Sequence, residues 1–335
     1  MKDIARRILA IIPTLLGVLI GIFFLTRILP GDPARTIAGE QASAETVEKI
    51  RVEMGLDQTL GQQFITYVGN LFRGDFGLAW HTGHPVAEDL AARLPATIEL
   101  GLTALLIAVV VGIPLGVVSA VRRGKFIDQA SRVIALIGAS MPLFWLGLLL
   151  LVLFYSALGW APAPMGRVPS GVNPPTSITG LYILDSILSG DMKGLIGSLR
   201  SIALPAICLS LGSMAVTARM MRSTMLETLG QDYVRTAHSK GLAPRVVIWK
   251  HAMKNAAPVI VTVIGLQVGQ MLGGAVITET IFAGPGVGSY VTNAIMATDY
   301  APVQAFTLIA ALVYLFVNLI VDITNARLDP RIRNV

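Results

Sequence analysis

Six long runs without a charged residue limit how this chain can fold more than any other feature of its sequence. They cover residues 8–26, 100–121, 134–158, 202–218, 256–277 and 303–321. A helix rises about 1.5 Å per residue, so roughly 20 apolar residues cross the ~30 Å hydrocarbon core of a bilayer. The fourth run is short, but it reaches Met221 if the Arg219 side chain extends its charge to the interface. Because backbone polar groups in lipid must bond within their own segment, the runs predict an all-α polytopic membrane protein with six transmembrane helices.

The composition is typical of a membrane protein. Apolar residues make up 54% of the 335 residues and charged residues 14%, against about 25% charged in an ordinary soluble domain. The net charge of +6 is compatible with nucleic acid or with anionic lipid, and the apolar runs favour lipid as the partner. The alternative is a large soluble core of buried helices. The first run, read as a cleaved signal peptide, is too long and lacks a cleavage site, so we expect it to be a retained span.

The distribution of Lys and Arg predicts the orientation. If the N-terminus is inside, the cytoplasmic segments carry 17 of the 26 Lys and Arg residues, and the external segments carry nine. The loop 278–302 has none. The positive-inside rule therefore places both the N- and the C-terminus in the cytoplasm.

Three parts follow from this pattern: residues 1–26 with the first span, an external helical segment 27–99, and a five-helix core 100–335. In the external segment, Ser43 is a candidate N-cap of a helix that stops near Gly55, and a second helix is expected from Leu60 to Phe72. We expect this segment to be a small cap on the external membrane face. The loop 159–201 is rich in Pro and Gly and is predicted to be irregular.

The cytoplasmic segment 219–255 carries the strongest local signal. Residues 223–240 are a helical stretch with a weak point at Gly230, Gly241 interrupts it, and Pro244 begins a second helix that leads into the fifth span. Glycine suits such an elbow because it adopts positive φ without steric cost. The sequence predicts either a rigid helix–Gly–helix projection or an ordinary basic loop on lipid headgroups.

At this segment the chain resembles a known family. The stretch Asp232-Tyr233-Val234-Arg235-Thr236-Ala237-His238-Ser239-Lys240-Gly241-Leu242 is similar to the cytoplasmic loop of ABC-importer permeases, in the version found in the dipeptide/oligopeptide/nickel permease family. Many sugar and amino-acid permeases have Glu-Ala-Ala where this chain has Arg235, Thr236 and Ala237. The resemblance extends over the whole chain. Further short motifs that match this family are Leu29-Pro30-Gly31-Asp32-Pro33, Gly74-Asp75-Phe76-Gly77, Arg93-Leu94-Pro95-Ala96-Thr97, Ser140-Met141-Pro142, Thr278-Glu279-Thr280-Ile281-Phe282 and Pro285-Gly286.

The resemblance implies a type I ABC-importer permease (MetI-like) fold in the inner membrane of a bacterium or archaeon. It implies three kinds of partner besides the lipid bilayer: a homologous second permease, two cytoplasmic ABC ATPase subunits, and a periplasmic or lipoprotein substrate-binding protein. No nucleic acid is expected. ATP and Mg would be bound by the ATPase subunits and no cofactor by this chain, which has no phosphate-binding G-x-x-x-x-G-K-[ST] motif. The residues implied to couple to the ATPase are Asp232, Tyr233, Arg235, Thr236, Ala237, His238, Ser239, Lys240 and Gly241, with Ala237 expected to be buried against the partner.

The translocation path is predicted to lie along the fifth span. Glycines four residues apart allow helices to approach closely and slide, and such pairs occur at Gly17/Gly21, Gly112/Gly116 and, in series, at Gly265, Gly269 and Gly273. The candidate path residues are Gln267, Gln270, Gly269, Gly273, Glu279 and Asn318. The alternative for each amide is a bond that holds two helices together. No acidic residue is expected in mid-membrane, which argues against a proton-driven carrier.

The remaining candidates point to no chemistry. His81 and His84 lack a third metal ligand, so they are expected to be structural. Cys208, the single cysteine, is expected to fill apolar space. No catalytic constellation is recognisable, so we predict a permease subunit and not an enzyme. The substrate is expected to be a di- or oligopeptide, with nickel, glutathione or an oligosaccharide as alternatives. The alternative from another class is an ATPase-independent channel or carrier.

Overall fold

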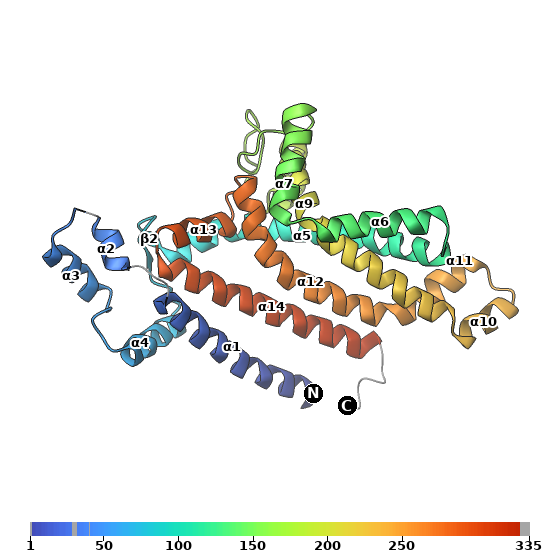
Figure 1. The fold of residues 1–335 in the computed structure, drawn as a ribbon, viewed down its shortest axis with the longest axis horizontal. Helices are drawn as coiled ribbons and strands as arrows, with labels where there is room; N and C mark the ends of the chain where they lie inside the picture. The colour runs from blue at the N-terminus through green and yellow to red at the C-terminus, as the bar shows by residue number, and fades with distance from the viewer. Residues whose placement is uncertain (1, 29–31, 40, 329–335) are drawn as a thin grey trace. The chain divides into compact units, whose positions relative to one another are not determined.

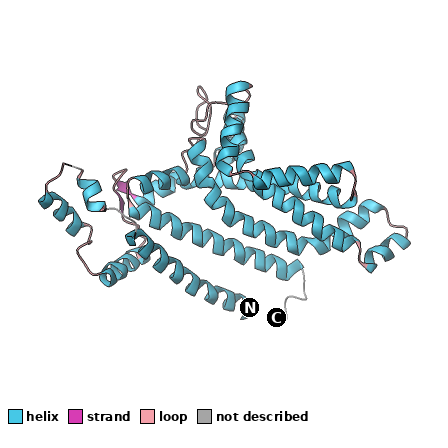
Figure 2. Ribbon diagram, viewed as in Figure 1, coloured by secondary structure: helices cyan, strands magenta, loops and turns pink. Residues whose placement is uncertain are grey.

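The computed structural model describes residues 2–28, 32–39 and 41–328, and the statements below concern these residues. Helices dominate, with one short antiparallel hairpin of β1 (Leu78–Ala79) and β2 (His84–Pro85) (Figure 2). The helices are α1 (Lys2–Ile28), α2 (Pro33–Ala38), α3 (Ala44–Glu53), α4 (Leu60–Phe72), α5 (Val86–Val121), α6 (Phe126–Ser140), α7 (Leu143–Leu150), the π-helical η1 (Leu151–Ala157), α8 (Tyr182–Ser189), α9 (Met192–Leu229), α10 (Asp232–Ser239), α11 (Pro244–Val246), the π-helical η2 (Val247–Ala252), α12 (Met253–Ile281), α13 (Val287–Met296) and α14 (Tyr300–Leu328) (Figure 1). The described part excludes the tail 329–335 and residues 29–31, which are the first three residues of the Leu-Pro-Gly-Asp-Pro motif.

Five of the six uncharged runs lie wholly within one helix each, and the third is divided among α6, α7 and η1. Four continuous helical segments are long and apolar enough to cross a membrane, namely Val86–Val121, Met192–Leu229, Pro244–Ile281 and Tyr300–Leu328. The first run lies in α1, a continuous helix of 27 residues that includes the apolar stretch Ile12–Ile28. The helical nature of the runs is confirmed, whereas the number of six spans stays a prediction.

The third run is not one continuous helix, which corrects the prediction of a single helix over residues 134–158. Its halves, in α6 and α7–η1, meet at 105° and form a broken span or a re-entrant loop. The break falls at Met141, whose extended ψ of 129° is the conformation that a following proline favours. Pro142 itself supplies no backbone N–H to continue the helix of α6.

The expected irregular loop 159–201 is also partly wrong. Residues 182–189 form α8, and α9 begins at Met192, ten residues before the fourth apolar run. The prolines of this segment all lie before residue 176, so none interrupts the helices that follow. Gly190 then closes α8 in the left-handed conformation, and Asp191 caps α9 by accepting a 3.0 Å hydrogen bond from the Gly194 amide.

The two helices predicted in the external segment are confirmed. The Ser43 hydroxyl accepts a 3.2 Å hydrogen bond from the Thr46 amide and caps α3, and Gly55 follows the helix with φ of +65°. The helix α4 covers Leu60–Phe72 as expected, with a capping box at Thr59 and Gln62.

The chain forms two compact units, of which the first combines Met1–Thr97 with Pro285–Val313. Its core holds Leu90 of α5, Tyr290 and Val291 of α13, and Ala305 of α14. Phe23 of α1 is fully buried, and its ring lies 5.1 Å from that of Phe64 in α4. The segment after the first span therefore packs with parts of the chain that are distant in sequence, while the predicted boundaries at residues 26 and 99 stay predictions.

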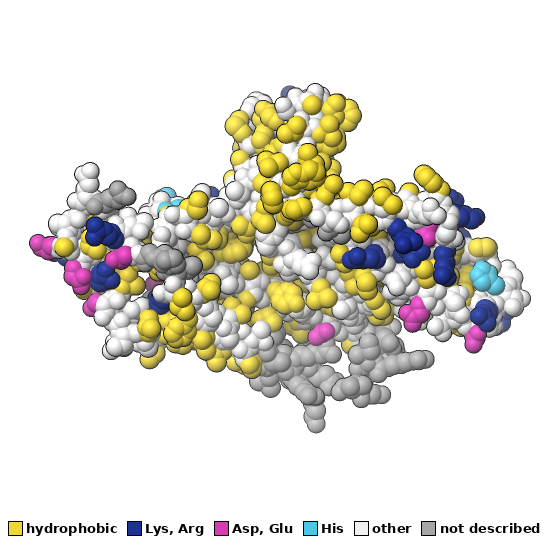
Figure 3. All heavy atoms as spheres, in the orientation of Figure 1, with side chains coloured by type: hydrophobic (Ala, Val, Ile, Leu, Met, Phe, Trp, Pro, Cys, Tyr) yellow, Lys and Arg dark blue, Asp and Glu magenta, His cyan; other side chains and the backbone are white. Residues whose placement is uncertain are grey.

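The second unit combines Ile98–Gly284 with Tyr314–Val335 and holds most of the apolar helices. One face of α5 presents small residues every four positions, from Ala104 and Ala108 to Gly112 and Gly116, all of them buried. The opposite face leaves large side chains exposed at Leu102, Leu106 and Val110. Apolar side chains cover much of the visible surface (Figure 3). Small residues inside and large apolar residues outside are typical of a helix that faces lipid or another membrane subunit.

Candidate functional site

The predicted elbow is present and is built by a glycine in the left-handed conformation. The helix α10 ends at Ser239, and Gly241 has φ of +75°. Its amide donates a 2.9 Å hydrogen bond to the His238 carbonyl, and the Leu242 amide donates to the Ala237 carbonyl at 3.3 Å. Pro244 then begins the helical segment that continues through η2 into α12. The chain thus reverses within four residues, and α10 stands at one end of the long helices of its unit (Figure 1).

Ala237 does not face outward, so the expectation that it is buried against a partner is wrong. Ala237 is 7% exposed and forms a small core with Val234 and Val247, which packs against Leu229. This core lies between α10, η2 and the end of α9. Residues 234 and 237 are three apart and share one face of α10, so the small side chain at 237 serves the folding of the elbow itself.

The remaining predicted coupling residues lie on the exposed surface of the elbow. These are Asp232, Tyr233, Arg235, Thr236, His238, Ser239 and Lys240. Arg235 and Asp232 form an open ion pair at 3.5 Å, which contributes little in water. The Tyr233 hydroxyl accepts a 2.9 Å hydrogen bond from the side-chain Nδ2 of Asn255 and ties α10 to the start of α12. The elbow therefore has a fixed inner face and a polar outer face available to another protein.

The candidate path residues are not gathered in one cluster. Gln267 and Glu279 are buried, Gln270 is exposed and Asn318 is half-buried. No hydrogen bond joins Gln267, Gln270 and Asn318 to one another in the described part of the chain. Gln270 and Gly273 instead share the exposed face of α12 with Leu266 and Ile277. This exposed face is the part of the predicted path that remains open to a second subunit or a solute.

The glycine series on the fifth span divides into two kinds of site. A Cβ atom at Gly269 would lie 2.6 Å from the Tyr314 ring, and one at Gly265 would meet Val321 even closer. Both glycines therefore let α12 and α14 approach within this chain. A Cβ at Gly273, Gly17 or Gly21 would meet nothing within 4 Å, so the expected close packing at these three is not seen. The expected close packing is seen at Gly112 and Gly116, because Cβ atoms added there would lie 3.0 and 2.6 Å from backbone oxygens of α9.

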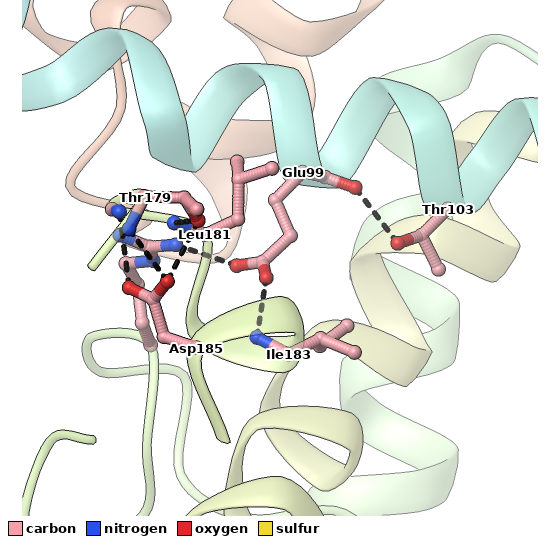
Figure 4. Close-up of polar contacts among 8 residues, drawn as sticks. Glu99, Thr103, Thr179, Leu181, Ile183 and Asp185 are labelled. Atoms are coloured by element: carbon pink, nitrogen blue, oxygen red, sulfur yellow. Dashed lines mark hydrogen bonds and ion pairs between the residues drawn. The ribbon is translucent and has the colours of Figure 1, made fainter. Parts of the chain in front are cut away.

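A buried ion pair fastens the Pro- and Gly-rich loop to α5, and the sequence reading missed it. Glu99 accepts a 2.6 Å hydrogen bond from Arg167 and a second, also 2.6 Å, from the Ile183 amide. The Arg167 guanidinium lies 3.6 Å from the centre of the Tyr182 ring. Figure 4 shows the Glu99 carboxylate extending from its helix toward Ile183. Because burial of a charge is costly unless it is paired, this contact ties the loop to the helix.

Asp185 organises the same loop from within. It is fully buried and accepts hydrogen bonds from the Thr179 amide and hydroxyl, both at 2.7 Å, and from the Gly180 amide at 3.0 Å (Figure 4). Burial alone would raise the pKa of Asp185, but these hydrogen bonds outweigh it and hold the pKa below its usual value. The ionised form thus stabilises the turn above pH ~4, and that stabilisation is lost as the pH falls.

The two histidines lie beside carboxylates, and the cysteine lies in apolar surroundings. The Nδ1 atom of His81 lies 2.8 Å from Asp299, and that of His84 lies 3.9 Å from Asp89. Within the described residues no three His, Cys, Asp or Glu side chains are placed to hold a metal ion. Cys208 is fully buried in an apolar cluster that contains Leu204 and Phe282.

A second buried ion pair links three helices and was not predicted. Asp128 of α6 accepts from Arg222 of α9 at 2.6 and 2.9 Å, and from Ser119 of α5 at 2.6 Å. The only signal in the sequence is that both charges lie just outside apolar runs, and pairing across about 90 residues cannot be deduced from one sequence. The bidentate geometry fixes the ends of these helices relative to one another.

Long apolar helices with an exposed helix–Gly–helix elbow define a class of protein, the helical membrane component of a transporter. The comparisons with known proteins agree. The family described as "Binding-protein-dependent transport system inner membrane component" matches residues 112–334, and its N-terminal companion family matches residues 1–101. The chain belongs to this family.

Relatives match over nearly the whole chain. The probable D,D-dipeptide transport system permease protein DdpB of Escherichia coli K12 is 44% identical over 94% of this chain and 93% of its own length. The dipeptide transport system permease protein DppB of the same strain is 41% identical over 100% and 99%, and the di/tripeptide transport system permease protein DppB of Pseudomonas aeruginosa is 43% identical over 100% and 99%. These names agree with the prediction of a permease subunit and not an enzyme.

A solved structure supports the fold. A chain of the inward-facing MetNI methionine ABC transporter aligns with 72% of this chain and 96% of its own length, with a TM-score of 0.51 and 15% identity. The likeness confirms the MetI-like fold of a helical membrane protein. The complete set of six spans and the side on which the termini lie stay predictions.

Proposed function

We propose that this chain forms the membrane path of an ATP-driven importer for di- or oligopeptides delivered by an external binding protein. The single observation that carries this proposal is the elbow at Asp232–Gly241, a rigid projection with a polar outer face in a chain that belongs to a binding-protein-dependent transport family. The peptide substrate is supported by the dipeptide and di/tripeptide names of relatives that match along nearly the full length.

The proposed complex contains a homologous second permease, two cytoplasmic ABC ATPase subunits and a periplasmic or lipoprotein binding protein. ATP and Mg bind to the ATPase subunits, and this chain holds no cofactor. The chain lies in the bacterial or archaeal inner membrane with six spans, both termini in the cytoplasm, and the elbow on the cytoplasmic side. The MetI-like fold and the distribution of Lys and Arg support this arrangement.

The proposed mechanism couples the elbow to the path through one continuous element. Residues 244–281 are helical from the base of the elbow to the external end of α12, so a displacement of the elbow is transmitted along α12. Closure of the ATPase pair would favour one state of the helices only if the elbow makes different contacts in the two states. The exposed side chains of α10 are the ones placed to make those contacts.

We expect uptake to require every proposed partner. In vesicles that contain this chain, its sister permease and the ATPase subunits, a labelled dipeptide should accumulate only when ATP and the binding protein are both present. Nickel, glutathione and an oligosaccharide serve as competing substrates, and affinity measurements on the binding protein rank them. Accumulation without ATP or without the binding protein would contradict the proposal and favour an ATPase-independent channel or carrier.

The proposed orientation predicts the sidedness of cysteine labelling. In a C208A background, a cysteine at exposed Ala44 should react with an impermeant thiol reagent added outside, and one at exposed Ser239 should react only after permeabilisation. Ala44 is preferred to its neighbour Ser43, because Ser43 caps α3 and its loss would weaken that helix. The reverse pattern would place both termini outside and overturn the arrangement.

A further inference from the structure

A cavity of about 710 Å³ opens between α5, α6 and α9, beside the buried Asp128–Arg222 pair. Polar and apolar groups divide its lining. Arg132, Arg219, Arg222 and Ser223 supply hydrogen-bond donors, and Leu115 and Leu136 supply part of its apolar wall. The coupling function proposed above uses none of these side chains.

The positive charge of the cavity is only partly compensated. Arg222 is neutralised by Asp128 through two hydrogen bonds of 2.6 and 2.9 Å. Arg132 and Arg219 are exposed and make no hydrogen bond or ion pair with any residue the structure describes. No acidic side chain lines the cavity. Two guanidinium groups are therefore available to an anion, and their fork of donors suits phosphate or carboxylate.

The position of the two arginines along their helices places them at the membrane surface. Arg219 directly follows the uncharged run 202–218, and Arg132 lies two residues before the run 134–158. The two helices pack against each other, so both charges stand at the same boundary of apolar surface. Charges at such a boundary lie at the level of the lipid headgroups.

The wall beside the arginines is apolar and open. Val133 and Leu136 line the cavity and are 56% and 65% exposed. In Figure 3, Lys and Arg side chains gather at the end of the molecule where α6 and α11 lie, next to hydrophobic side chains along α6. A ligand that fills this site has an anionic head and an apolar tail.

We propose that the cavity binds the phosphate of an anionic phospholipid, with Arg132 and Arg219 on the phosphate oxygens and an acyl chain along Val133 and Leu136. Free phosphate would satisfy the arginines and leave the apolar wall unused. A carboxylate of a partner subunit is the third possible occupant. The lipid is favoured because the unpaired charges lie at the boundary of apolar runs and beside exposed apolar side chains. The site depends on the helix ends reaching the headgroups, and not on which side of the membrane they face.

Native mass spectrometry of the full-length protein in detergent tests the proposal. The probes are dioleoyl phosphatidylglycerol, dioleoyl phosphatidylcholine and inorganic phosphate. The wild type should retain phosphatidylglycerol in preference to phosphatidylcholine. An excess of inorganic phosphate should not displace the bound phosphatidylglycerol. In R132Q/R219Q the affinity for phosphatidylglycerol should fall about 30-fold. R132K/R219K keeps both charges, so its affinity for phosphatidylglycerol should stay close to that of the wild type. This second variant keeps the test valid if R132Q/R219Q folds poorly.

The matched control is R122Q/R123Q, which removes two arginines from the neighbouring turn between α5 and α6. Both side chains are exposed and do not line the cavity, so lipid retention in detergent should remain that of the wild type. Equal loss in the control would reduce the effect to general charge attraction and overturn the proposal. Phosphate that binds alone and displaces the lipid would make this a free-anion site. Unchanged lipid binding in R132Q/R219Q with loss of a partner subunit would assign the arginines to a protein carboxylate.

Discussion

A valine in place of Gly241 should lower uptake by the reconstituted complex at least about tenfold, because it disturbs the elbow through the backbone alone. Gly241 has φ of +75°, and a Cβ atom there would meet nothing within 4 Å. The substitution therefore causes no clash. A β-branched residue at positive φ is strained by roughly 1–3 kcal/mol, and the elbow can relieve that strain only by changing the direction of the chain between α10 and α11.

The expected defect is specific to coupling. The G241V protein should insert in the membrane and pair with its sister permease, since a Cβ atom at residue 241 meets nothing within 4 Å in the described part of the chain. It should co-purify with less ATPase, or hydrolyse ATP without uptake. The matched control is G241N, because asparagine tolerates the left-handed conformation better than other side chains. Normal ATPase retention and normal uptake in G241V would contradict the coupling role, and an equal defect in G241N would assign the effect to side-chain volume.

A substitution of Ala237 by glutamate would not test docking of the ATPase, because Ala237 is buried within the elbow. A glutamate there would place a charge among Val234, Val247 and Leu229, at a cost of several kcal/mol unless the helix moves. Loss of ATPase from A237E would then report an unfolded elbow. Bulk on the exposed face, as in T236W or S239W, tests docking without disturbing that core.

The elbow and the external helices could be predicted because their signals are local. Ser43 before α3, the apolar face of α4 and the glycine at 241 act within one or two helical turns, and the structure has each of them as expected. The long apolar runs likewise predicted helices without any knowledge of their neighbours. In each case the physical cause lies within the segment that forms the element.

The tertiary partners could not be predicted in the same way. The small size of Ala237 indicated burial, but whether its neighbour is Val247 of the same chain or a second protein depends on how the chain turns at Gly241. The Glu99–Arg167 and Asp128–Arg222 pairs join residues 68 and 94 positions apart, so nothing in either local sequence identifies the partner. The glycine series on the fifth span has the same limit, since spacing alone does not separate Gly269, which packs on Tyr314, from Gly273, where an added Cβ would meet none of the described residues within 4 Å.

That separation makes Gly273 the sharper probe of the translocation path. A leucine at Gly273 should leave folding of this chain intact, because the space around it is open and the position is exposed on α12. If the exposed face of α12 lines the path or slides against the second permease, the same leucine should lower transport at least about tenfold, since added bulk at a close helix contact forces the helices apart. The measurement is uptake in vesicles, normalised to the amount of assembled complex and to its thermal stability.

The matched variant is Gly269→Leu, which places the same side chain one helical turn away on a packed face. Its Cβ would lie 2.6 Å from the Tyr314 ring, so G269L should lower the amount and the thermal stability of the protein, as overpacking does at a typical cost of about 1–3 kcal/mol. A transport defect without a stability defect in G273L, and a stability defect in G269L, would separate path from packing along one helix. Full transport by a stably assembled G273L complex would show that the exposed face of α12 is not part of the moving path, and would leave lipid as its neighbour.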